Sequence, residues 1–170
     1  ESISSSESMG QASPGSPHGA ENASLADDNR EGFPSTSHLS VIDREGNAVS
    51  MTTTIERAFG SRLMVRGFLL NNQLTDFAFL PRVDGRAVAN AVAPGKRPRS
   101  SMSPTLVFDT DSKLFATVGS PGGSRIIGYV TKTLLGLMDW NLDMQAAIDL
   151  PNHINRNGAT ELEKDTVLVE

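Results

Sequence analysis

The sequence contains no cysteine, which excludes disulfide bonds, thiol catalysis and thiolate metal sites. Aromatic residues make up only 5% of the chain, against 38% hydrophobic residues in all, so the core must be mainly aliphatic. No apolar run approaches the roughly 20 residues of a membrane-spanning helix, so we expect no membrane insertion in this segment. The formal net charge of −5 gives no reason to expect nucleic acid as a partner.

The composition changes sharply along the 170 residues. Residues 1–35 are rich in serine, glycine and proline and nearly free of bulky apolar side chains, so burial cannot offset the entropy of ordering them. We therefore predict a flexible tail or linker over residues 1–35 and a folded domain over residues 36–170.

Alternating apolar and polar residues predict two β-hairpins. In the first, the turn sequence DREGN separates the two strands, and Gly46 can take the positive φ of a short hairpin loop. The alternating apolar residues of its strands are Leu39, Val41, Val49 and Met51. The second hairpin is predicted from residues 105–109 and 114–119, joined by the turn-prone TDSK.

Two helices are predicted after these hairpins. Residues 120–140 pass from a glycine turn into apolar residues at helical spacing, and residues 141–152 form a shorter pattern that Pro151 stops. Because strands and helices do not strictly alternate, the order favours a layered α+β sandwich over a doubly wound sheet.

Four polar clusters could carry chemistry, and each has a plain structural alternative. Hydroxyls gather at both ends of the first hairpin, where threonine also suits an exposed strand. Residues 68–77, FLLNNQLTDF, crowd amides and a carboxylate that could simply form turns. Residues 95–105, GKRPRSSMSPT, are basic but lack the interleaved aromatics of a nucleic-acid site. Residues 119–125, GSPGGSR, could bind an oxyanion through backbone amides or only form a tight turn.

Taken together, these clusters resemble the small, catalytic subunit of the γ-glutamyltranspeptidases (γ-glutamyltransferases), which are N-terminal nucleophile hydrolases. The resemblance is carried, in the family's order and spacing, by TSHLSVIDREGNAVSMTTTIE, FLLNNQLTDF, ANAVAPGKRPRSSMSPT and GSPGGSRI. SMGQASPGSP, within residues 1–35, is similar to the end of the large subunit. The resemblance implies the small-subunit portion of an αββα sandwich, C-terminally incomplete because the late Asp-Pro-Arg-type motif is absent.

The resemblance also implies a mechanism. In this family the precursor cuts itself between the residues that are here Ser35 and Thr36, which frees an N-terminal threonine. Its α-amino group, with a pKa of about 7.7 to 8.0 in model peptides, can then serve as the base for its own hydroxyl. Thr54 matches a second threonine that assists the nucleophile, while Gly122 and Gly123 match the donors to the oxyanion.

The remaining blocks would bind the substrate. By resemblance, the amine of a γ-glutamyl group such as that of glutathione would be surrounded by Glu56, Gln73 and Asp76. Its carboxylate would be held by Ser100 and Ser101, together with an arginine of the large subunit. The large subunit of the same precursor is therefore the expected protein partner. No metal or organic cofactor is implied, and the resemblance suggests a periplasmic or secreted protein.

Two departures bear on specificity. Position 56 is glutamate where many members have asparagine, and residues 77–89 are short and lack the tyrosine of a longer lid loop. A related amide hydrolase, such as a cephalosporin-type acylase, and a non-catalytic domain of the same fold therefore stay open as alternatives. The 170-residue piece alone is expected to be inactive, since Thr36 lacks a free amine while Ser35 is bonded to it.

Overall fold

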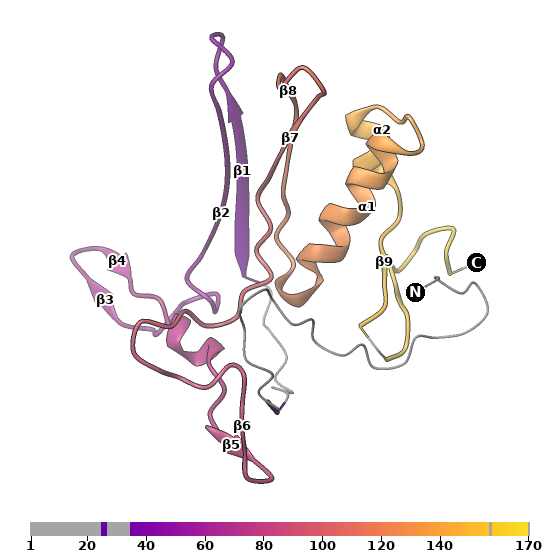
Figure 1. Ribbon diagram of the computed structural model, residues 1–170. Coiled ribbons are helices and arrows are strands. Elements are labelled where there is room, and N and C mark those ends of the chain that lie inside the picture. The colour runs from indigo at the N-terminus through magenta and orange to yellow at the C-terminus, as the bar shows by residue number, and fades with distance from the viewer. Residues whose placement is uncertain (1–24, 27–34, 157, 170) are drawn as a thin grey trace. The chain divides into compact units, whose positions relative to one another are not determined.

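The computed structural model describes residues 25–26, 35–156 and 158–169. The described residues divide into two units, one of residues 25–150 and the other of residues 151–169. The predicted tail, residues 1–35, lies outside the described residues except for positions 25, 26 and 35. Figure 1 shows the elements of both units.

The first predicted hairpin is confirmed as β1 (Thr36–Ile42) paired antiparallel with β2 (Ala48–Thr54). Its turn is held by Asp43, whose carboxylate accepts hydrogen bonds from the backbone N–H groups of Glu45 and Asn47 at 3.0 and 2.8 Å. The Asn47 side chain donates to the same carboxylate, and this bond, first among several, holds the pKa of Asp43 below its usual value. Gly46 takes the expected positive φ of 87°.

The second predicted hairpin, β7 (Thr105–Phe108) with β8 (Leu114–Val118), uses the same device. Asp109 accepts from the backbone N–H groups of Asp111 and Lys113 at 2.9 and 2.8 Å, as Asp43 does in the first turn. Here Ser112 takes the positive φ, 61°, at the position equivalent to Gly46. The two turns are therefore specified by an aspartate at the first position rather than by glycine alone.

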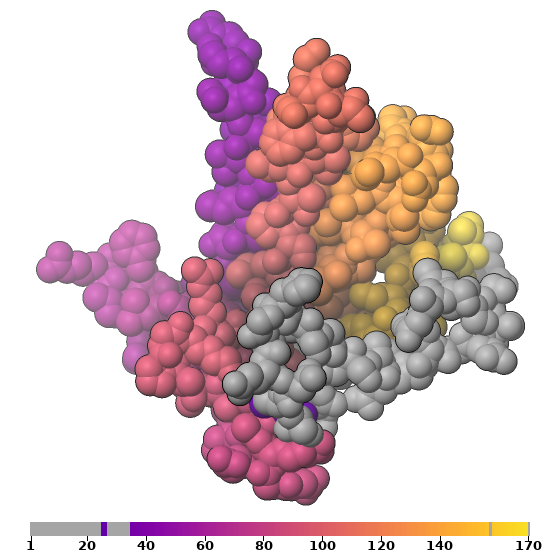
Figure 2. Space-filling view, in the orientation of Figure 1, coloured from indigo at the N-terminus to yellow at the C-terminus, as the bar shows by residue number. Residues whose placement is uncertain are grey.

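Both predicted helices are present. A short 3₁₀ turn, η2 (Gly123–Arg125), leads into α1 (Ile126–Met138), and α2 (Met144–Asp149) follows and ends before Pro151. The Asp143 side chain accepts from the backbone N–H of Ala146 and caps α2. The buried hydrophobic residues are mainly aliphatic, as expected, with Phe77 as the aromatic exception, and one cluster of them consists of Ala116, Val118, Ile126 and Val130. In the space-filling view, the atoms of α1 lie against those of the β7–β8 hairpin (Figure 2).

Short elements that the sequence pattern did not predict connect the two hairpins. They are the strand pairs β3 (Met64–Val65) with β4 (Phe68–Leu69) and β5 (Arg82–Val83) with β6 (Arg86–Ala87), and the 3₁₀ turn η1 (Gln73–Asp76). Ala26, in the predicted tail, is buried and bridges Val88. In the second unit, β9 (His153–Ile154) pairs with β10 (Glu161–Leu162).

The structure is of mixed α and β content, as predicted. Across the described residues every sheet has two strands, so the αββα arrangement itself stays a prediction. None of the helices in this part of the chain has the length and apolar character needed to span a membrane.

The two faces of the β1–β2 hairpin differ in character. One face carries Thr36, His38 and Ser40 opposite Thr54, Thr52 and Ser50. On this face, Ser50 donates to the Val118 carbonyl of β8 at 3.3 Å, and Thr117 of β8 donates to Ser40 at 3.2 Å. The other face is apolar and remains 40% to 55% exposed at each of its large side chains, Leu39, Val41, Val49 and Met51. The hairpin therefore turns its polar side towards the rest of its own unit.

A buried lysine joins the two helices. Lys132 of α1 is 7% exposed, and its ammonium group donates to the carbonyl oxygens of Ile148 and Leu150 at 3.0 and 2.7 Å. These carbonyls lie at the end of α2, where a cation also complements the helix dipole.

We predict that Lys132→Met destabilises the full-length protein by about 1.5 to 3 kcal/mol, because charge-assisted bonds are lost and two carbonyls lose their donor. Urea unfolding measures the change. Lys113→Ala, at an exposed turn position, is the matched control and should shift stability by less than about 0.5 kcal/mol. A Lys132→Met midpoint equal to that of the control would contradict the proposed role of this lysine.

Candidate active site

The antiparallel register of the first hairpin places Thr36 directly opposite Thr54. Both side chains are half-buried on the polar face of the hairpin. Cross-strand neighbours of this kind have Cβ atoms about 4.5 to 5.5 Å apart. The register thus brings these two strand ends together, while the functional pairing of the two hydroxyls stays a prediction.

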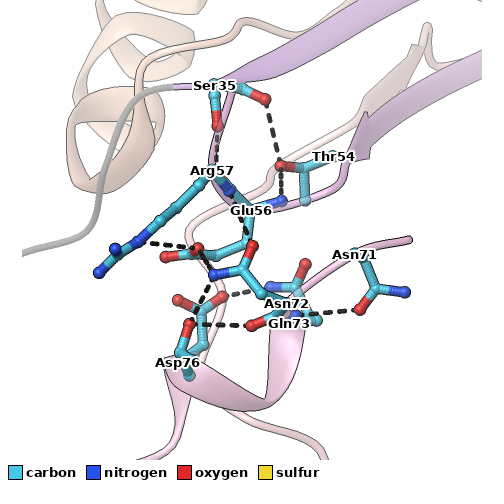
Figure 3. Close-up of polar contacts among 9 residues, drawn as sticks. Ser35, Thr54, Glu56, Arg57, Asn71, Asn72, Gln73 and Asp76 are labelled. Atoms are coloured by element: carbon cyan, nitrogen blue, oxygen red, sulfur yellow. Dashed lines mark hydrogen bonds and ion pairs between the residues drawn. The ribbon is translucent and has the colours of Figure 1, made fainter. Parts of the chain in front are cut away.

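The Thr54 hydroxyl contacts the backbone on both sides of the hairpin end. It donates to the carbonyl oxygen of Ser35 at 3.3 Å and accepts from the backbone N–H of Glu56 at 2.9 Å. The Ser35 hydroxyl in turn donates to the carbonyl oxygen of Glu56. The peptide bond between Ser35 and Thr36 is therefore held against the end of β2, with a hydroxyl donor on its carbonyl (Figure 3).

Glu56 is a buried carboxylate in an unusual backbone conformation. Its side chain is 5% exposed and its φ is 73°, a region that residues with a Cβ rarely adopt. The carboxylate accepts a hydrogen bond from Asn72 Nδ2, and Arg57 Nε lies 3.6 Å from the same oxygen. The turn at Glu56 directs the carboxylate towards η1 rather than along β2 (Figure 3).

The predicted amine-binding residues come together around η1. Gln73 Nε2 donates to the Asp76 carboxylate, and Asn72, at the start of η1, links this turn to Glu56. Asn72 also accepts from the backbone N–H of Arg57 at 3.2 Å. Figure 3 shows two hydrogen-bonded side-chain pairs, Glu56 with Asn72 and Gln73 with Asp76, in the region that follows Thr54. Two carboxylates and two amides are a set of groups suited to a cation with several hydrogen-bond donors.

The two serines of the predicted carboxylate site lie in the segment that leads into β7. Ser100 Oγ accepts from the backbone N–H of Met102 at 3.2 Å, which leaves its hydroxyl proton able to serve a ligand. The backbone carbonyl of Ser101 accepts from the Ser103 hydroxyl at 2.9 Å. This segment is tied to η1 through Asn90, which bonds both to Asp76 and to Arg99.

The predicted oxyanion glycines form the turn between β8 and α1. Gly122 has φ 138° and Gly123 has φ 58°, so both take conformations that favour glycine. A Cβ at Gly122 would meet the Tyr129 ring at 2.8 Å, which also requires glycine there. Within the described part of the chain, no hydrogen bond joins either glycine to Thr36.

His38 of β1 packs against the start of this glycine turn. Its ring nitrogens bond the hydroxyls of Thr52 at 2.9 Å and Ser40 at 3.1 Å. The ring packs directly on Gly119, where an added Cβ would overlap the imidazole atoms. Desolvation of the ring lowers the pKa of His38 below its ordinary value of 6.5.

The sequence of this chain matches the model of a known family. The family model for gamma-glutamyltranspeptidase matches residues 1–169. The chain belongs to the gamma-glutamyltranspeptidase family. This confirms the resemblance inferred from the four sequence blocks.

Individual members of the gamma-glutamyltranspeptidase family show the extent of the likeness. A glutathione hydrolase proenzyme of Bacillus subtilis is 48% identical over 118 residues, which cover 68% of this chain and 19% of the relative. A Thr-to-Ala mutant of Helicobacter pylori gamma-glutamyltranspeptidase is 42% identical with a TM-score of 0.66, covering 75% of this chain and 73% of that one. An acivicin-inhibited gamma-glutamyltranspeptidase, whose C-terminus is critical for autoprocessing and catalysis, is 44% identical with a TM-score of 0.61, covering 70% and 66%. The chain thus spans about a fifth of the Bacillus proenzyme.

Three residues of the site, His38, Asn72 and Asn90, bond segments that are separated along the chain. From the sequence, Asn72 was identified only as a member of the polar cluster at residues 68–77, and His38 and Asn90 were not identified as site residues. All three lie inside the sequence blocks that carried the resemblance. Their position within those blocks was the available signal, but local patterns could not supply their partners.

The lowered pKa of His38 predicts a pH dependence of stability. Above pH 6.5 the His38 imidazole is mainly neutral in both the folded and the unfolded state. As pH falls below that value, the unfolded state takes up its proton first, so the free energy of unfolding decreases.

Wild type should therefore lose more stability between about pH 7.5 and about pH 5 than His38→Gln does, since glutamine keeps hydrogen-bonding capacity without titrating. Urea midpoints at both pH values give the comparison. Parallel pH profiles in the two proteins would mean that His38 is not desolvated.

Proposed function

We propose that the full-length protein is a γ-glutamyltransferase and glutathione hydrolase that cleaves itself before Thr36. The observation that carries this proposal is the meeting of Thr36, Thr54 and the Ser35 carbonyl at one hairpin end. This constellation continues directly into the cluster around Glu56 and Asp76.

Self-cleavage begins with attack of the Thr36 hydroxyl oxygen on the carbonyl carbon of Ser35. The bond to the Thr36 nitrogen breaks, the nitrogen takes up the proton, and an ester joins the two residues. Water then hydrolyses this ester and leaves a carboxylate on Ser35 and a free α-amine on Thr36. The Thr54 hydroxyl, 3.3 Å from the Ser35 oxygen, supports the first step by donating to the oxygen on which negative charge develops.

Turnover reuses the same hydroxyl. The free α-amine of Thr36 accepts the hydroxyl proton as the oxygen attacks the γ-carbonyl of a donor such as glutathione. The departing amine takes that proton, and a γ-glutamyl ester of Thr36 remains. An amino acid, a peptide or water then attacks the ester and restores the threonine. Backbone N–H groups of Gly122 and Gly123 are the proposed oxyanion donors, each worth about 3 to 4 kcal/mol.

The γ-glutamyl group would be held by its charged end. Its ammonium group fits the cluster of Glu56, Gln73 and Asp76, which offers two carboxylates. Because Gln73 donates to Asp76 from Nε2, its Oε1 is the atom that can accept from the ammonium group. Its carboxylate would be bound by Ser100 and Ser101. Because these hydroxyls are neutral donors, an arginine of the large subunit is expected to complete the site.

The rest of the proposal follows from family membership. We expect the 36–170 segment to be one part of an αββα sandwich that the large subunit completes. The exposed apolar face of β1–β2 supports this, since such a face in a folded protein requires a covering layer. A periplasmic or secreted location is also proposed.

We predict that Thr36→Ala abolishes both self-cleavage and release of p-nitroaniline from γ-glutamyl-p-nitroanilide in the full-length protein. The variant lacks the oxygen that both reactions require. Mass spectrometry of the subunits and a colorimetric assay measure the two outcomes. Thr53→Ala, on the opposite face of β2, is the matched control and should keep both activities. Persistence of either activity in Thr36→Ala would assign the nucleophile to another residue.

We predict that Asp76→Asn raises the KM for the γ-glutamyl donor by about 10 to 150-fold, because one charge-assisted hydrogen bond to the ammonium group is lost. Self-cleavage should proceed normally, since the uncut chain presents no substrate ammonium. Initial rates across donor concentrations, with gel analysis of subunits, separate the two effects. Donor kinetics equal to wild type would remove Asp76 from the amine site.

A further inference from the structure

The buried side chain of Asn90 joins the two halves of the candidate substrate site. Asn90 is 8% exposed and lies in the segment between β6 and β7. Its Nδ2 donates to the backbone carbonyl of Asp76 at 2.6 Å, and its Oδ1 accepts from the backbone N–H of Arg99 at 2.9 Å. One planar amide therefore spans the end of η1 and the residue that precedes Ser100.

The backbone of Asn90 is itself fixed. Its carbonyl accepts from the N–H of Ala78 at 3.0 Å, in a bridge formed with Ala91. The neighbouring carbonyl of Ala89 accepts from the Lys96 ammonium group, which closes the loop between residues 89 and 96. An amide anchored in this way can hold the end of η1 and the Ser100 segment at a fixed distance from each other.

The two partners of Asn90 adjoin groups that would bind the two opposite charges of an α-amino acid. Asp76 presents a carboxylate, and Ser100 and Ser101 present hydroxyl donors immediately after Arg99. An α-amino acid group carries its ammonium and carboxylate on one carbon, so both binding groups must sit at a set separation to engage it together. A buried amide that makes a hydrogen bond on each side is suited to set that separation.

We propose that Asn90 is a positioning residue that fixes the distance between the ammonium-binding and carboxylate-binding groups for an α-amino acid moiety. This inference rests on the proposed γ-glutamyltransferase function and adds to it the group that sets the geometry of the binding site. Asn90 acts through Asp76 and the Ser100 segment and has no role in bond cleavage.

Two variants of the full-length protein test the assignment. Asn90→Ala removes both bonds. Asn90→Asp has nearly the same shape and keeps the acceptor for Arg99, but it faces the Asp76 carbonyl with an oxygen in place of a donor. Both should raise the KM for γ-glutamyl-p-nitroanilide about tenfold or more, with kcat changed less than about threefold and normal self-cleavage. Lys113→Ala, at the exposed β7–β8 turn, is the control and should match wild type.

A double-mutant cycle shows whether Asn90 acts through Asp76. If it does, Asp76→Asn combined with Asn90→Asp should lose no more than about twofold beyond Asp76→Asn alone. Fully additive losses, an unchanged KM in both Asn90 variants, or failure of both to cleave themselves would overturn the proposal. A wild-type protein that releases no p-nitroaniline would instead overturn the proposed function, which is a separate outcome.

Discussion

The candidate site depends on one constraint, the register of the β1–β2 ladder. Thr36 can meet Thr54 only while Leu39 pairs with Met51 and Val41 pairs with Val49. A slip by one residue would move every hydroxyl of the polar face to the opposite side of the sheet. The Asp43 turn protects against this slip, because it fixes the number of loop residues through bonds to Glu45 and Asn47.

From that hairpin end the polar groups continue without interruption into the loops. Glu56 leaves β2 with a positive φ, and its carboxylate bonds Asn72 at the start of η1. Asn90 then connects η1 to the serine segment. The proposed nucleophile and substrate-binding groups are thus placed by buried or half-buried hydrogen bonds rather than by a large apolar core. Loss of one link should affect its neighbours more than distant groups.

The sequence predicted those parts whose cause is local. Both long hairpins, α1 and α2 follow from alternation, helical spacing and turn residues, and the family followed from four blocks. Two-residue strands such as β3 were missed because they are too short to show a period. The contacts of His38 and Asn90 were missed because their partners lie far along the chain, where residue type alone does not indicate which groups meet. Each two-stranded sheet pairs strands that are consecutive along the chain, and alternation does not indicate whether such hairpins join into a larger sheet.

The two-stranded sheets also affect how this polypeptide can be prepared. In the described residues each strand has a neighbour on one side, so β1, β2, β7 and β8 each present an open edge of backbone N–H and C=O groups. Such edges, next to side chains such as Leu39 and Phe115, recruit further strands and promote aggregation. Produced by itself at high concentration, this segment should assemble into β-rich aggregates. Co-expression with the large subunit proposed above should therefore reduce this aggregation.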